Sequence, residues 1–340
     1  MSLAFVITSI QDPTVGVRAI AAHALESGAL LLVVGDKKSP EPWNCPGAQF
    51  LSYEDQLSLD FALGQHVPAN SYARKMLGYL TAMSSGSRWI RETDDDNAPY
   101  EKFFDAAPDS LTCNIAGSTS GWFNAYTHFT DRFVWPRGYP LSVVGASGPE
   151  DSTKEVQEVR APFILQAVAD GDPDVDAIYR LTAPDTSDIT FAGNRPLALP
   201  AGVWCPFNSQ ATTWPRELFA LMYLPVTCTF RMTDIWRSFV VQRLLPGLGA
   251  TLVFTEATVH QDRNEHDLLA DFVQEVPGYL GTERIRAVLD ATEIQGGTAS
   301  VLSDLRALYE ALVHGGFLTS AELPVLDAWI ADVRRLGLCN

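Results

Sequence analysis

The first ninety residues alternate between continuous apolar runs and segments with helical periodicity. Leu3–Ile10 and Leu30–Asp36 are nearly unbroken apolar runs, as expected for strands buried on both faces of a sheet. Between them, Val15–Gly28 repeats its apolar residues at helical spacing and ends in glycine. A strand, a helix and a strand in this order predict a βαβ unit, and therefore a parallel, Rossmann-like sheet with helices on both faces.

A second helix and a short strand follow in the same half. Asn70–Gly86 has apolar residues at helical spacing behind an Asn or Ser cap, and Ser87–Ile90 has the length of a strand. The acidic stretch Glu92–Asn97, which reads ETDDDN, is then expected on the loop beyond the carboxyl end of that strand. Open α/β sheets bind their ligands at this edge.

The rest of the chain predicts a second half and a helical tail. Phe163–Thr182 suggests a helix, a Gly-Asp-Pro break with turn and capping chemistry, and a short helix, although its first residues would also suit the sheet. Val226–Met232 alternates like a strand, and a helix is expected from Thr233. We therefore expect a catalytic domain over residues 1–265, with a nucleotide-binding half (1–97) and an acceptor half (98–265), and a helical region over 266–340 that braces the core or an oligomer contact.

Composition excludes several classes of protein. With 340 residues, 46% of them hydrophobic, the chain is long enough for a large core. Its net charge of −17 argues against nucleic-acid binding, which depends on clustered lysine and arginine. The five cysteines have no CxxC spacing and fit a reducing cytoplasm. No apolar run approaches the roughly 18 residues of a membrane span, and the amino terminus suits a first strand better than a signal peptide.

The aspartate triplet Asp94, Asp95 and Asp96 is the strongest candidate for chemistry. Mg²⁺ and Mn²⁺ prefer oxygen ligands and are commonly held by one or two carboxylates while substrate phosphates and water complete the shell. Asp94 and Asp96, two residues apart, are suited to supply that pair. The alternative is a solvated acidic turn.

Other candidates lie around the triplet in the expected fold. Asp36 ends the second strand, where it either binds a ribose or base or caps a turn. Arg137, in an aromatic segment expected to form a packed wall, either contacts a phosphate or sugar or stacks on Trp135. Asp234 begins a helix and is either its cap or a general base at the edge of a cleft. Two local basic spots suit a small phosphorylated ligand, and they contain Lys37, Lys38, Arg74 and Lys75.

Several longer segments together resemble the STELLO-type glycosyltransferase family, known best from plants. They occur in the family's order between about Val33 and Phe272, and they include VVGDKKSPEPW, PANSYARKMLGYLTAM with ETDDDN, NAYTHFTDRFVWPRGYPL, FNSQATTW, TDIWRSFVVQR and HQDRNEHDLLADF. The resemblance implies a GT-A-like fold in which the triplet is the DxD motif that holds Mn²⁺ or Mg²⁺ against a nucleoside diphosphate-sugar. Because the chain starts at the first predicted strand, the amino-terminal membrane anchor of the plant relatives is not expected.

The resemblance also implies roles for individual residues. Asp94 or Asp95 would contact ribose or cation, Asp96 would bind the metal, and Asp234 would deprotonate the acceptor. His260 would complete the metal shell or contact the diphosphate, unless it is a loop histidine bonded to backbone. Base and phosphates would be held by Asp36, Lys37, Arg74 and Lys75.

The donor is then expected to be a nucleoside diphosphate-sugar, preferably a UDP-sugar, and the acceptor an unknown glycan, lipid or protein. Three alternatives are a nucleotide-sugar mutase like the reversibly glycosylated polypeptides, a metal-dependent phosphohydrolase, and a noncatalytic scaffold that binds the nucleotide-sugar. The phosphohydrolase is disfavoured because the first strand ends in Thr8-Ser9-Ile10, where the haloacid type would carry its nucleophilic aspartate.

Overall fold

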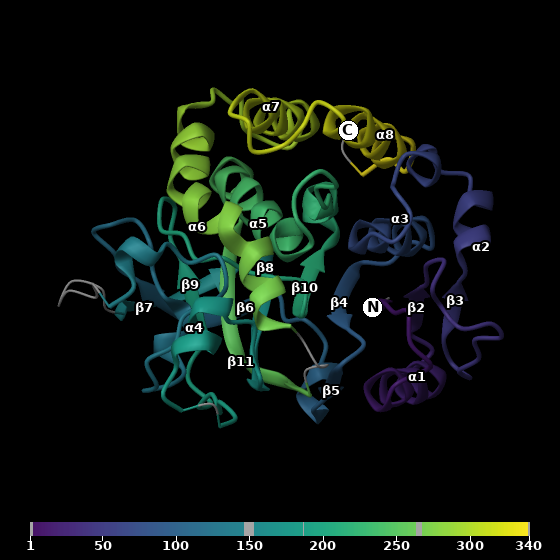
Figure 1. Ribbon diagram of the computed structural model, residues 1–340, viewed down its shortest axis with the longest axis horizontal. Coiled ribbons are helices and arrows are strands. Elements are labelled where there is room, and N and C mark those ends of the chain that lie inside the picture. The colour runs from purple at the N-terminus through teal and green to yellow at the C-terminus, as the bar shows by residue number, and fades with distance from the viewer. Residues whose placement is uncertain (1–2, 146–152, 186, 263–266, 339–340) are drawn as a thin grey trace.

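The computed structural model describes residues 3–145, 153–185, 187–262 and 267–338 (Figure 1). Within these residues, eleven strands form one mixed sheet in the order β3-β2-β1-β4-β10-β8-β11-β9-β6-β7, with β5 paired to β11. The strands from β3 to β4 are parallel. Beyond β4 the sheet is mixed, because β10 runs antiparallel to both β4 and β8. β10 therefore joins a parallel first half to a mixed second half.

The first half is a Rossmann-like unit with a helix on each face. Along β1, Ala4 and Val6 belong to the same apolar cluster as the buried residues of α3, while Phe5 and Ile7 pack in a second cluster with α1. This alternation explains the continuous apolar run, since both faces of the strand are covered. The elements are β1 (Leu3–Thr8), α1 (Val15–Ser27), β2 (Leu30–Val34), β3 (Gln49–Leu51), α2 (Tyr53–Ser58), α3 (Lys75–Ser84) and β4 (Trp89–Asp94).

The second half builds the other part of the sheet and packs α5 against one of its faces. Buried aromatic residues from the segment after β6 fill the space between the strands and α5; Trp122, for example, meets Phe239 of α5 edge to face. The elements are β5 (Asn97–Pro99), β6 (Ser110–Ala116), β7 (Thr153–Arg160), β8 (Phe163–Gly171), α4 (Ala177–Thr182), β9 (Leu197–Leu199), β10 (Ala211–Pro215), α5 (Thr233–Leu244) and β11 (Thr251–Gln261).

Three helices make up the end of the chain, and α7 and α8 lie along the upper edge of the view in Figure 1. They are α6 (Leu268–Ala291), α7 (Val301–His314) and α8 (Glu322–Arg335). Their buried side chains, such as Leu305, Leu308 and Trp329, belong to the same apolar cluster as Val6 and Ile164 of the sheet. The helical region is thus part of one continuous core. The expected boundary at residues 265 and 266 lies outside the described residues.

The expected α/β class, the Rossmann-like first half and the helical tail are confirmed. Three local predictions were wrong. Residues 163–171 form the central strand β8 and not a helix. Residues 226–232 are not a strand. Phe230–Met232 form a 3-10 helix, and the backbone N–H groups of Val226 and Thr227 donate to the side chain of Glu322 instead of a neighbouring strand. The strand expected at 87–90 runs on to Asp94, so that only Asp95 and Asp96 form the turn before β5.

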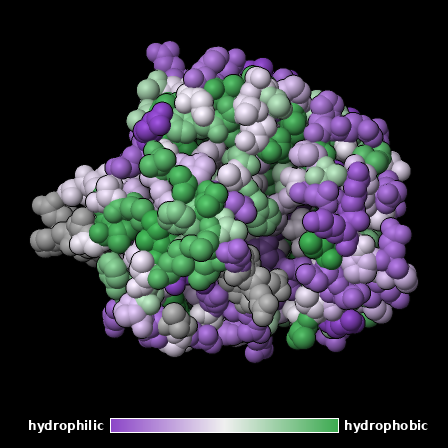
Figure 2. Space-filling model, viewed as in Figure 1, coloured by the Kyte–Doolittle hydropathy of each residue, from purple (hydrophilic) through white to green (hydrophobic). Residues whose placement is uncertain are grey.

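The surface of the molecule has a hydrophilic part and an apolar part (Figure 2). The face shown in Figure 2 is mostly hydrophilic over the first half and carries an apolar area in the region of α4 and α6. Leu269, Val273 and Leu280 are exposed on one side of α6. None of the helices in the described part of the chain is both long enough and apolar enough to cross a membrane.

Candidate functional site

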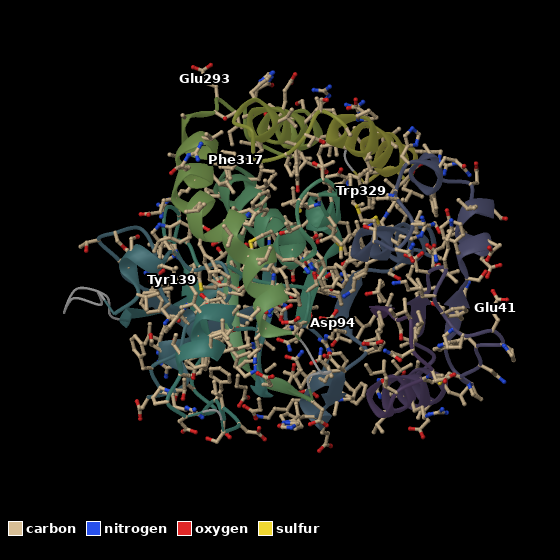
Figure 3. All side chains as sticks on the ribbon, viewed as in Figure 1. Glu41, Asp94, Tyr139, Glu293, Phe317 and Trp329 are labelled. Atoms are coloured by element: carbon tan, nitrogen blue, oxygen red, sulfur yellow. The ribbon has the colours of Figure 1, made fainter. Side chains whose placement is uncertain are left out.

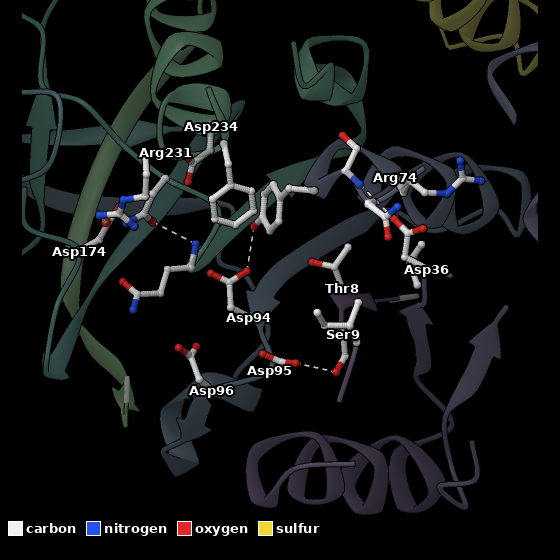
Figure 4. Close-up of a pocket in the computed structure, with 18 of the residues that line it drawn as sticks. Thr8, Ser9, Asp36, Arg74, Asp94, Asp95, Asp96, Asp174, Arg231 and Asp234 are labelled. Carbon is white, nitrogen blue, oxygen red and sulfur yellow. Dashed lines mark hydrogen bonds and ion pairs between the residues drawn. The ribbon is translucent and has the colours of Figure 1, made fainter. Parts of the chain in front are cut away.

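A cavity of about 330 Å³ opens between the two halves of the sheet. It lies at the carboxyl ends of β1, β2 and β4. The chain first adds β2 and β3 on one side of β1 and then adds β4 on the other side. Such a crossover leaves a crevice in which α/β proteins bind ligands. Asp94 lies near the centre of the molecule (Figure 3). Asp36 and Arg74 lie at one end of the cavity, the aspartate triplet in the middle, and Asp174, Arg231 and Asp234 at the other end (Figure 4).

Asp94 is fixed at the end of β4 by two donors from the first half. Its Oδ1 accepts a hydrogen bond from the Tyr72 hydroxyl at 2.8 Å and pairs with the Lys75 ammonium at 3.0 Å. Lys75 is fully buried and also donates to the carbonyl of Thr93. Lys75, which was predicted to bind the ligand, therefore does not line the cavity. It pairs with Asp94 from within the core and compensates its charge.

Asp95 forms the turn after β4. Its Oδ2 accepts a hydrogen bond of 2.5 Å from the Ser9 hydroxyl, which follows β1. Its carbonyl accepts from the Thr14 hydroxyl, and Thr14 is also the cap of α1. Burial and the neighbouring Asp94 raise the pKa of Asp95, although the Ser9 hydrogen bond opposes this change. The turn is therefore tied to both β1 and α1.

Asp96 has an unsatisfied carboxylate oxygen. Oδ2 accepts from the Gln261 amide at 3.0 Å, whereas Oδ1 is buried and has no hydrogen-bond partner among the described residues. Burial, followed by the charge of Asp94, raises its pKa to about 7. A buried carboxylate without a partner is unfavourable, and a bound cation would relieve both the desolvation and the repulsion within the triplet. Asp96 thus fits the role of a metal ligand.

Gln261, and not His260, is the residue of β11 that lines the cavity. Neighbouring strand residues point to opposite faces, so only one of the two can reach the triplet. Gln261 bonds Asp96, and its Oε1 accepts from the Gln210 amide. The His260 ring instead lies 3.3 Å from Asp262. The structure does not bring the predicted histidine into the cavity, and sequence reasoning missed Gln261 because it interpreted this stretch as a loop.

The wall of the second half contains a buried ion-pair network around Arg137. The guanidinium pairs with both oxygens of Asp174, each at 2.7 Å, and lies 3.2 Å from Asp234. The two carboxylates keep the pKa of Arg137 well above its usual value, despite burial, and Arg137 keeps that of Asp174 below its usual range. The structure places the predicted Arg137 in the cavity. Sequence reasoning missed Asp174, whose GDPDVD context suggested only turns and caps.

Asp234 has features of both roles considered for it. It is the second residue of α5, and its Oδ1 accepts from the backbone N–H of Ile235 at 3.0 Å. Its Oδ2 accepts from the Ser209 N–H at 3.2 Å, and the side chain lines the cavity. Burial raises its pKa, and the charge of Arg137 partly opposes this effect. A buried carboxylate with a raised pKa is suited to accept a proton.

Three residues from the loops after β2 and before α3 form the opposite end of the cavity. The carboxylate of Asp36 accepts from the backbone N–H groups of Lys37 and Ser71 at 2.7 and 3.1 Å. Arg74 is buried and donates to Gln56 and Val67, while its Nη2 has no hydrogen-bond partner in the described ranges. Burial lowers the pKa of Arg74. Lys38 lines this end, whereas Lys37 lies over the ring of Tyr53 and does not.

The cavity does not supply a complete metal shell by itself. Across residues 3–145, 153–185, 187–262 and 267–338, no three His, Cys, Asp or Glu side chains are grouped closely enough to hold a metal ion. This agrees with the usual coordination of Mg²⁺, which takes one or two carboxylates and draws its other ligands from phosphates and water. Asp96 with Asp94 or Asp95 would provide the protein's share.

The comparisons of the sequence with known proteins agree with the resemblance of the motifs. Residues 231–339 match the model of the STELLO glycosyltransferases. The chain is 32% and 31% identical to "Probable glycosyltransferase STELLO1" and "Probable glycosyltransferase STELLO2" of Arabidopsis thaliana, over 91% of this chain and 42% of each relative. It thus spans less than half of their length. A solved structure, the M. tuberculosis glucosyl-3-phosphoglycerate synthase, matches with a TM-score of 0.40 and 12% identity over 83% of this chain and 80% of that chain. Over the region that it shares with these plant relatives, the chain belongs to the STELLO glycosyltransferase family.

Proposed function

We propose that the cavity is a divalent-metal-dependent glycosyltransferase site, which takes a nucleoside diphosphate-sugar, preferably a UDP-sugar, and transfers the sugar to an acceptor hydroxyl. The unpartnered Oδ1 of Asp96 carries this proposal, because it lies beside two further carboxylates at the crossover edge of a parallel sheet. Family membership supports the same reaction class.

The metal would be held by Asp96 together with Asp94 or Asp95. When bound, Mn²⁺ or Mg²⁺ neutralises the charge that develops on the leaving diphosphate. The chain's own contribution is to keep the carboxylates in place through Tyr72, Lys75 and Ser9.

The nucleoside would lie at the end of the cavity formed by Asp36 and Arg74. Asp36 is held by two backbone donors, and its remaining lone pairs are able to accept from a ribose hydroxyl or the N–H of uracil. Arg74 and Lys38 supply positive charge at this end. In this order the diphosphate would lie over the triplet and the sugar toward Asp234.

At the sugar, the acceptor oxygen forms a bond to the anomeric carbon while the bond from that carbon to the phosphate oxygen breaks. The electron pair of the broken bond leaves with the nucleoside diphosphate. The acceptor's proton passes to Asp234, whose burial raises its pKa and so favours proton uptake. This assignment applies to an inverting reaction, in which a base deprotonates the attacking acceptor hydroxyl.

Calorimetric titration of UDP and GDP, with and without Mn²⁺, tests the proposal. We expect UDP binding that depends on Mn²⁺ in the wild type and is lost in Asp96→Asn, which keeps the size of the side chain but removes its charge. The matched control is Asp109→Asn, since Asp109 is exposed, with 77% of its side-chain surface accessible, and is not among the residues that line the cavity.

Three results would count against the proposal. Equal UDP binding with and without Mn²⁺ would mean that no metal takes part in binding. If neither nucleotide bound, the noncatalytic scaffold would be the favoured alternative. If a UDP-sugar were converted to an isomer without release of UDP, the site would be that of a mutase.

A further inference from the structure

The wall of the cavity on the acceptor side is charged but electrically compensated. Arg137 pairs with Asp174 and Asp234, as described above. Arg231, which also lines the cavity, lies 2.7 Å from the buried Glu275. The third arginine of this wall, Arg180, pairs with Asp172. An anionic group bound here would lie beside these carboxylates as well as the arginines, so that the wall offers it little net positive charge.

One aromatic side chain of this wall is exposed to the cavity. Phe230 lines the cavity and keeps 57% of its surface accessible. Its ring meets the ring of Tyr72 edge to face, with centroids 5.7 Å apart. Because the Tyr72 hydroxyl bonds Asp94, Phe230 lies next to the triplet and not at the Asp36 end.

The backbone around Phe230 is held on both sides. The hydroxyl of the preceding Thr229 donates to the carbonyl of Gln274 in α6. The carbonyl of the following Arg231 accepts from the guanidinium of Arg137. A large apolar ring is thus held facing the cavity, although burying it in the core would be favourable. Its position is explained if its exposed face meets a ligand.

We propose that Phe230 is the stacking platform of an acceptor subsite for a neutral carbohydrate. A pyranose has apolar C–H faces that stack on an aromatic ring, and its hydroxyls both donate to carboxylates and accept from arginines. The wall offers paired carboxylates and arginines beside the exposed ring of Phe230, and therefore fits a neutral sugar. A phosphorylated acceptor would be repelled by the carboxylates of the wall, and a lipid chain has no hydroxyls to bond the polar groups there. The inference rests on the proposed transferase function, since it assigns the acceptor of that site.

Binding to an array of neutral oligosaccharides of hexoses and pentoses, with UDP and Mn²⁺ present, tests this subsite. We expect the wild type to bind at least one class of glycan, and Phe230→Ala to bind it about tenfold more weakly, as the loss of one aromatic contact predicts. Phe230→Trp should restore binding, and Phe230→Leu, which is apolar but not aromatic, should not.

Phe133→Ala is the matched control. Phe133 is also an exposed phenylalanine, 68% accessible, whose ring meets Trp135 edge to face at 5.4 Å, but it does not line the cavity. It should leave glycan binding unchanged. An equal loss in both variants would overturn the subsite, as would a wild type that binds UDP with Mn²⁺ but no neutral glycan.

Calorimetry with UDP separates the two proposals. The subsite predicts that Phe230→Ala keeps its affinity for UDP, and a loss of UDP affinity would instead make the ring a platform for the base. Glycan binding that depends on Phe230 without any UDP binding would retain the subsite and overturn the transferase. If neither ligand binds, both proposals fail.

Discussion

The metal-free protein compensates the ionised form of Asp96 poorly. Its Oδ1 is buried without a hydrogen-bond partner in the described residues, and Asp94 and Asp95 are its neighbours in the chain. Because its pKa is raised from 3.8 to about 7, the folded chain keeps a proton that the unfolded chain has already lost. Between these two pH values the free energy of unfolding therefore falls as the pH rises. Above about pH 7 the ionisation of Asp96 no longer changes this free energy with pH.

We expect Asp96→Asn to flatten this pH dependence in the metal-free protein. The measurement is urea unfolding in the presence of a chelator at several pH values from about 4 to 8. Asp109→Asn should keep the wild-type slope. If the free energy of unfolding of Asp96→Asn and of the wild type depends equally on pH, the Asp96 carboxylate is already ionised at low pH. Desolvation and repulsion at the triplet would then not raise its pKa.

Asp234 leads to a separate prediction about turnover. Asp234→Asn should lower the rate of UDP-sugar hydrolysis by about 10²-fold or more, because it removes the group that accepts the proton of the attacking hydroxyl or water. Arg137 keeps Asp174 as its partner in this variant, so the fold and the affinity for UDP should be retained. UDP release and calorimetry measure the two effects. Turnover close to that of the wild type would make Asp234 only a cap of α5.

At the scale of elements, the approach of α1 to β5 sets the position of the triplet. Gly16, in the first turn of α1, lies against the backbone of Asn97, so that a Cβ there would be 1.9 Å from the Asn97 carbonyl oxygen. Asn97 directly follows Asp96, and Thr14 at the cap of α1 bonds Asp95. A larger residue at position 16 would push the helix and the turn apart.

Gly16→Ala should therefore weaken Mn²⁺-dependent UDP binding and destabilise the protein by about 1–3 kcal/mol, the usual effect of overpacking. Gly281→Ala in α6 is the control, because its Cβ would make only ordinary contacts, the nearest at 3.5 Å to Phe317. It should be neutral or stabilising. Unchanged UDP affinity in Gly16→Ala would show that the triplet does not depend on the position of α1.

At the scale of the whole molecule, α8 connects the two halves. The carboxylate of Asp332 accepts from the backbone N–H groups of Ala62 and Leu63 in the first half, each at 2.9 Å. At the start of the same helix, Glu322 accepts from Val226 and Thr227 in the second half, a few residues before Phe230. Because the cavity lies between the halves, the helical region sets the frame in which its two walls face each other.

We expect the chain to unfold in one cooperative transition, since the main apolar cluster extends from Ala4 to Val333. Asp332→Ala should lower the stability of this single transition by about 1–3 kcal/mol, because it removes the acceptor of the buried Leu63 N–H and of the Ala62 N–H. Asp327→Ala, at an exposed position of α8, should have little effect. Calorimetry measures both, and two separate transitions in the wild type would contradict a shared core.

Local patterns were sufficient for the first βαβ unit and for placing the triplet near the carboxyl end of a strand. Helix α1, which covers one face of β1, and strand β2 follow β1 directly in the chain, so the apolar runs and the period of α1 already predicted the unit. The same kind of signal failed for β8, because a short apolar run such as FILQAV suits a buried strand as well as a helix. Its neighbours β10 and β11 come 40 or more residues later in the chain, and they determine its structure.

The sequence by itself determined which chemistry is available: three adjacent carboxylates after a buried strand, and motifs shared with one family. Only the tertiary structure decided how each residue is used. Lys75 holds Asp94 from behind, Gln261 takes the place expected of His260, and Arg137 joins Asp174 and Asp234, which lie 37 and 97 residues away in the chain. The physical reason is that a local pattern records which residues are apolar or charged, whereas the partner of a buried charge depends on how distant segments pack.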